Sequence, residues 1–112
     1  MRRLRWLWPL ALTCLVLSVT VVSAQDLEIP LSIEKNRFQP AEIRVKAGTP
    51  FVLVITNKDA TPEEFESKEL RVEKVVPGNK TLKVRMGALK PGTYKFFGEY
   101  HEATAKGRIV AE

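Results

Sequence analysis

Cysteine and histidine are both scarce in this chain of 112 residues, which has one of each. Cys14 lies in the apolar stretch near the N-terminus, so the rest of the chain can form no internal disulfide. His101 has no serine or cysteine nucleophile in a recognisable catalytic arrangement, and the sequence has no phosphate-binding loop and no dinucleotide fingerprint. General acid-base catalysis would have to depend on His101 or on a glutamate with a raised pKa. We therefore expect a binding protein and not an enzyme.

Long apolar runs are also rare, because the chain has only one, at residues 10–22, and arginines precede it. The run ends at the small residues Ser23 and Ala24, a pattern typical of a secretory signal peptide cleaved after Ala24. This predicts a signal peptide at residues 1–24 and one domain at residues 25–112, located in the periplasm or secreted. A run of this length also suits a membrane anchor that is kept, so both outcomes stay open.

The net positive charge of the chain comes largely from the predicted signal peptide, which contributes three arginines and no acid. The formal net charge is +5, but removal of the predicted signal peptide leaves 15 basic against 13 acidic residues. Lysines and glutamates are interspersed there without a basic block, which argues against a nucleic-acid partner. No motif indicates a small-molecule substrate. A domain of this size has a modest core, and without disulfides its stability must come from good β packing or from a metal.

The apolar residues of the predicted domain follow a period of two. Leu27, Ile29, Leu31 and Ile33 alternate with polar residues or proline, and residues 50–57 form a near-continuous β-branched run typical of a central strand. Turn sequences rich in Pro, Gly and Asn separate these segments from later alternating ones. The pattern predicts an all-β fold, a Greek-key two-sheet β-sandwich. Residues 63–74 are the exception: their charges would suit a helical turn, but the apolar positions Phe65, Leu70 and Val72 fit an irregular loop that leads into a strand better.

Two segments carry a more specific resemblance: RFQPAEIRVKAGTPFVLVITNKDATPEEF and LKPGTYKFFGEYHEATAKGRIV. Their order and spacing resemble the cupredoxin superfamily, and in detail the EfeO-type cupredoxin-like domain of exported iron-transport proteins. The resemblance covers nearly all of residues 25–112. It implies the same sandwich, in which two ligand-bearing loops meet at one end.

The resemblance also locates the four ligand positions of blue-copper proteins, and only one of them is kept. Glu63 stands at the first histidine position, Gly98 at the cysteine position and Ala105 at the axial methionine position. The second histidine is present as His101. A blue-copper centre needs a thiolate with two imidazoles. The resemblance therefore implies that this chain has no blue-copper centre, and we expect Gly98 to leave open the space of the missing sulfur.

The same two loops are rich in glutamate and suggest a different metal site. The candidate ligands are Glu63, Glu66, Glu99, His101 and Glu102, with Glu64 beside them. Oxygen ligands with one imidazole suit Cu(II), Fe(III) or Zn(II) better than Cu(I), and we expect Cu(II) or Fe(III). A bound cation would also relieve the repulsion between the carboxylates. The alternative is an ordinary solvated surface, in which Lys68 and Lys106 balance the charge.

Two functions follow from these observations. The first is a metal-binding accessory of iron or copper uptake, which would capture Cu(II) or Fe(III) and pass it to, or oxidise it for, a membrane iron permease or another envelope metal-transport protein. The second is a metal-free cupredoxin scaffold that acts as an interaction module in an envelope complex.

Overall fold

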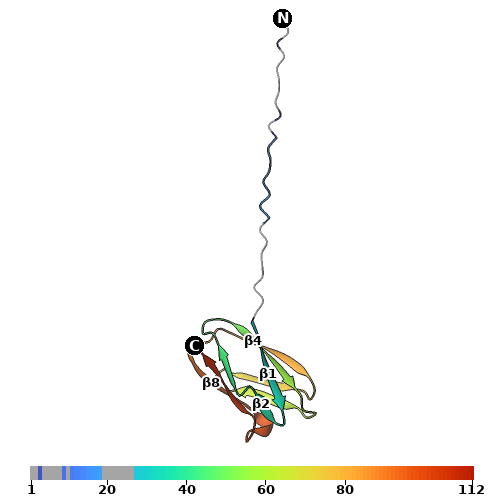
Figure 1. Cartoon of the computed structure of the whole chain (residues 1–112), viewed down its shortest axis with the longest axis vertical. Coiled ribbons are helices and arrows are strands. Elements are labelled where there is room, and N and C mark those ends of the chain that lie inside the picture. Colours follow the sequence, from blue (N-terminus) through green and yellow to red (C-terminus); the bar gives the residue numbers. More distant parts are fainter. Residues whose placement is uncertain (1–2, 4–8, 10, 19–26) are drawn as a thin grey trace.

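The β-sandwich lies within residues 27–112 of the computed structural model, which describes residues 3, 9, 11–18 and 27–112 (Figure 1). Its strands in chain order are β1 (Leu27–Glu34), β2 (Arg37–Gln39), β3 (Glu42–Val45), β4 (Phe51–Asn57), β5 (Glu63–Ser67), β6 (Val72–Val76), β7 (Thr81–Met86), β8 (Gly92–Gly98) and β9 (Lys106–Ala111). A short 3-10 helix, η1 (Glu99–His101), follows β8 directly.

The strands form two sheets, as the sequence predicted. One sheet has the order β2-β1-β4-β7 and the other has the order β3-β9-β8-β5-β6. β1 pairs in parallel with β4, and β3 pairs in parallel with β9, whereas the remaining pairs are antiparallel. The prediction of an all-β, Greek-key two-sheet sandwich is therefore confirmed.

The core between the sheets is built from the alternating apolar residues. β4 is buried at nearly every position, as expected for a strand that lies between β1 and β7. Phe38, Phe65 and Phe96 meet in the core with ring centroids 5.0 to 6.0 Å apart, and these aromatic contacts join the two sheets. The predicted inward alternation of β1 holds for Leu31 and Ile33, but Leu27 is 55% exposed because it lies at the start of the strand.

The prediction of an irregular loop is wrong for residues 63–67, which form β5, whereas the strand that the loop was expected to enter is present as β6, from Val72. The two strands pair as an antiparallel hairpin, with Glu66 opposite Glu73. Phe65 and Ser67 are buried together with Glu63, so one face of β5 is enclosed even though the segment is rich in charge. Ser67 stabilises the hairpin turn, since its hydroxyl donates to the carbonyl of Lys95 and accepts from the amide of Leu70.

One end of the sandwich collects the segments predicted to bear ligands. β1, β4 and β8 end there, and β5 and β9 begin there. In Figure 1 this is the end that carries the orange-red η1, opposite the start of β1. Asn57 orders the link from β4 to β5, because its buried side chain donates to the carbonyls of Thr61 and Val76.

The predicted signal peptide lies largely outside the described residues, so cleavage after Ala24 stays a prediction. Among the described residues, no helix is long and apolar enough to cross a membrane.

Candidate metal centre

Glu63, the first residue of β5, is a buried carboxylate at the loop end of the sandwich. Its residue is 1% exposed. Oε1 accepts hydrogen bonds from the backbone amides of Glu64, at 3.0 Å, and Tyr100, at 2.9 Å. These two amides belong to β5 and η1, so one carboxylate ties the two ligand-bearing segments together.

His101 completes the set of partners around Glu63. Its ring nitrogen Nδ1 forms a hydrogen bond with Oε2 of Glu63 at 2.6 Å, in which the carboxylate oxygen accepts when the histidine tautomer carries its proton on Nδ1. The histidine side chain is 32% exposed, whereas that of Glu63 is 2% exposed. Both carboxylate oxygens of Glu63 are therefore in use, and the Nδ1 atom of His101 is not available to a metal while this contact persists.

The expectation that Gly98 leaves an open space is wrong. A Cβ atom at this position would lie 2.6 Å from Cδ of Glu63 and 2.7 Å from Cβ of Ala105. Both neighbours are fully buried. The carboxylate of Glu63 thus fills the space beside the backbone at the expected cysteine position, and only glycine fits against it.

Four other glutamates form a separate cluster on the outer face of the five-stranded sheet. Carboxylate oxygens of Glu64, Glu66, Glu73 and Glu99 all lie within 4.8 Å of one another. Glu64 and Glu66 project from the same side of β5 because they are two residues apart, Glu73 lies across from Glu66, and Glu99 begins η1. We refer to these four residues as the carboxylate cluster.

Glu64 is the most enclosed member of the carboxylate cluster, at 6% exposed. Among the described residues no N–H or hydroxyl group donates to its side chain, which meets the carboxyl groups of Glu73 and Glu99 instead. Hydrogen bonding to these two groups, together with burial and their negative charge, raises the pKa of Glu64 to about 8. The protonated form is favoured because two carboxyl groups can share a hydrogen bond only when one holds a proton.

Glu66 experiences a weaker version of the same environment. Burial raises its pKa, and the negative charges of Glu99 and Glu73 raise it further, whereas Lys68 lowers it. Two members of the carboxylate cluster, Glu64 and Glu66, therefore have raised pKa values. A bound cation would have the opposite effect, since it would stabilise all four carboxylates in their charged form.

The five predicted ligands thus lie in three different places. Glu63 and His101 contact each other, Glu66 and Glu99 belong to the carboxylate cluster, and Glu102 lies beside a lysine-rich hollow on the outer face of the same sheet. Glu73 was not among the predicted ligands. The strict alternation of Glu64 and Glu66 around a buried Phe65 is the signal that could have placed these acids on the outside of a strand.

The donor residues at this end do not fit a blue-copper centre. A blue-copper centre needs a thiolate and two imidazoles, but only one imidazole is present, and its Nδ1 is held by Glu63, while the positions that the resemblance assigns to the thiolate and the axial ligand carry Gly98 and Ala105. Cys14 precedes β1 and belongs to neither sheet.

A two-sheet sandwich whose candidate ligands gather at the end where β5, β8 and η1 meet has the architecture of a cupredoxin. The cupredoxin-like domain family matches residues 7–111, and the chain belongs to this family.

Relatives in sequence and structure agree with this assignment. The chain is 39% identical over 84 residues to the uncharacterized protein RP394 of Rickettsia prowazekii, covering 75% of this chain and 67% of that protein. It is 36% identical over 88 residues to amicyanin-alpha of Methylorubrum extorquens, covering 73% of this chain and 70% of that protein. The fold matches auracyanin A, a blue copper protein of Chloroflexus aurantiacus, with a TM-score of 0.67 and 16% identity, over 79% of this chain and 100% of that structure.

Proposed function

We propose that this chain is an exported cupredoxin-like protein that binds Cu(II) or Fe(III) and assists the uptake of iron or copper. The observation that supports the proposal best is the carboxylate cluster. Four acids there place oxygen atoms within 4.8 Å of one another, and the most buried of them, Glu64, has no donor among the described residues.

The composition of the carboxylate cluster favours a hard cation. It consists of oxygen donors, which suit Fe(III) better than they suit copper, because copper also seeks nitrogen or sulfur. The cation would replace the shared protons and remove the repulsion that keeps these groups from ionising together. Glu66 and Glu99 thus retain the ligand role expected of them, and Glu64 and Glu73 join them.

The role proposed for Glu63 and His101 is to support the carboxylate cluster. Glu63 accepts from the amide of Glu64, which is itself a cluster member, and from the amide of Tyr100, which follows the cluster member Glu99 in η1. Glu63 stands where the resemblance places a copper ligand, and here it holds β5 and η1 together. Electron transfer through a blue-copper centre is not part of this proposal.

The location and the partner are proposed from the sequence. The pattern of residues 1–24 supports export to the periplasm, and the resemblance to EfeO-type domains supports a membrane iron permease or another envelope metal-transport protein as the partner. The role is binding and delivery, with no catalytic step.

Metal titration of the chain tests the proposal. The protein, expressed from its full coding sequence and freed of metal with a chelator, is titrated with Fe(III), Cu(II) and Zn(II) in a calorimeter. We expect micromolar or tighter binding, and we expect the double variant Glu64→Gln with Glu66→Gln to weaken it by at least about tenfold. Glu28→Gln with Glu34→Gln makes the same chemical change at two exposed glutamates of β1 outside the carboxylate cluster and serves as the control. Equal affinity in both double variants would refute the assignment of the ligands.

A metal-free scaffold is the second candidate function, and the contact between Glu63 and His101 favours it. This contact closes the family's copper position with an internal hydrogen bond. On this account the wild-type chain binds none of the three ions in the micromolar range, and the titration above separates the two functions.

A further inference from the structure

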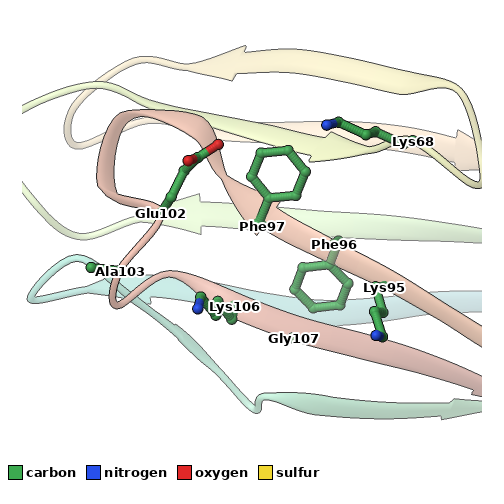
Figure 2. Close-up of a pocket in the computed structure, with 8 residues that line it drawn as sticks. All are labelled: Lys68, Lys95, Phe96, Phe97, Glu102, Ala103, Lys106 and Gly107. Carbon is green, nitrogen blue, oxygen red and sulfur yellow. The ribbon is translucent and has the colours of Figure 1, made fainter.

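A hollow on the outer face of the five-stranded sheet lies beside the carboxylate cluster and has the opposite charge. Its volume is about 540 Å³, within the range of small-ligand pockets. Figure 2 shows its lining, which includes Lys68, Lys95, Phe97, Glu102, Lys106 and Gly107. We refer to it as the lysine hollow.

Three lysines from three different segments surround the lysine hollow. Lys68 follows β5, Lys95 lies in β8, and Lys106 begins β9. All three are exposed, and none forms an ion pair with a carboxylate in the part of the chain that the structure describes. Glu102 is the one acid in the lining, so the hollow carries a surplus of positive charge.

Phe97 provides an apolar surface between these charges. It is half-buried on the outer face of β8, and Nζ of Lys68 lies 5.7 Å from the centre of its ring. In Figure 2 the ring of Phe97 lies between the side chains of Lys68 and Glu102. A ligand that contacts both the ring and the lysines needs carbon atoms as well as several negative charges.

The carboxylate cluster lies next to the lysine hollow, so its charge should affect the affinity of the hollow for an anion. Phe97 lies opposite Glu66 in the pairing of β5 with β8, so the hollow and the cluster are immediate neighbours. The negative charge of the cluster opposes an anion in the hollow, because exposed charges closer than about 10 Å still interact at ordinary ionic strength.

We infer that the lysine hollow binds a small organic anion with two or more carboxylates. Its carboxylates contact Lys68, Lys95 and Lys106, and its carbon skeleton lies on Phe97. This site goes beyond the proposed function and does not depend on it, because the anion binds whether or not the carboxylate cluster holds a cation.

The test uses citrate as the probe on the metal-free full chain. We expect citrate to bind at low salt and its affinity to fall as salt is raised. Replacement of the three lysines by glutamine should weaken citrate binding by about tenfold, since exposed ion pairs are individually weak. The control replaces three exposed lysines that do not line the hollow, Lys46, Lys58 and Lys80, and should keep most of the affinity.

Two further arms locate and define the ligand. Glu64→Gln with Glu66→Gln should strengthen citrate binding, because the Glu66 carboxylate opposite Phe97 is then absent. Inorganic phosphate should bind more weakly than citrate, because it cannot use the apolar ring.

Several results would overturn the inference. These are no citrate binding, equal loss of affinity in the two triple variants, no gain in the double glutamine variant, or phosphate binding as tight as that of citrate. The outcome is distinguishable from failure of the proposed function. Citrate binding without metal binding would support the hollow and refute the metal role, and metal binding without citrate binding would do the reverse.

Discussion

Gly98 is the residue at which the buried carboxylate of Glu63 leaves no room for a side chain. Glycine is required there because the carboxylate of Glu63 and the methyl group of Ala105 already occupy the space that a side chain would need. The carboxylate of Glu63 can therefore occupy this space only while residue 98 is a glycine.

Gly98→Ala is expected to destabilise the fold by about 1–3 kcal/mol, the usual cost of forcing a methyl group into a packed site. The free energy of unfolding, measured with urea, checks this. Gly87→Ala is the matched control, because a Cβ atom at Gly87 meets nothing within 4 Å. A loss of stability in Gly98→Ala no larger than in Gly87→Ala would show that Glu63 does not occupy this space.

Glu64 gives a pH dependence with an unusual sign. Its pKa of about 8 in the folded protein exceeds the ordinary value of 4.5, so the folded chain binds the proton more tightly than the unfolded chain does. Stability of the metal-free protein should therefore be greatest at low pH with respect to this group and should decrease as pH rises from about 4.5 to about 8.

Melting temperatures recorded across this pH range test the prediction. Glu64→Gln should flatten the profile, because the titrating group is gone, whereas Glu34→Gln should keep it. A wild-type profile that rises through this range would contradict the environment described for Glu64.

At the scale of elements, the contacts between β5 and η1 hold this end of the sandwich together. Glu63 at the start of β5 accepts from Glu64, Tyr100 and His101, and the last two belong to η1. These contacts keep Glu64 and Glu99 close although 34 residues separate them in sequence. The hairpin of β5 and β6 adds Glu73 from the other side.

Glu63→Leu should destabilise the chain by about 3 kcal/mol, because it leaves buried donors without an acceptor. Glu63→Gln should cost less, since its carbonyl oxygen still accepts from the two amides. Chemical denaturation measures both. The nuclear magnetic resonance signals of the amides of Glu64 and Tyr100 should shift in both variants, and unchanged signals would exclude the hydrogen bonds to Glu63.

The sequence predicted the sandwich well, because period-two alternation is clear in β1 and β7 and the near-continuous apolar run of β4 is typical of a central strand. Charge hid the same alternation in β5, where Glu63 points inward and Glu64 outward. The two acids therefore looked alike in the sequence and have different roles in the fold. The resemblance correctly placed Glu63 near His101, but a single sequence did not show that they bind each other instead of a shared ion.

At the scale of the whole molecule, function is assigned to one outer face of the sandwich. The five-stranded sheet presents the carboxylate cluster and the lysine hollow side by side, with Phe97 opposite Glu66 between them. The interior end, where other members of the fold family would hold copper, is filled by Glu63 and His101. We therefore expect a bound metal at this outer surface and not in the interior of the loop end.

Anomalous diffraction from crystals of the chain loaded with Fe(III) measures the position of the metal directly. A map calculated from data at the iron absorption edge should show one strong peak among the carboxylate oxygens of Glu64, Glu66, Glu73 and Glu99. The contact between Glu63 and His101 should remain intact in the same crystal. A peak bound to the ring of His101, or no peak at the carboxylate cluster in crystals that contain iron, would contradict the account.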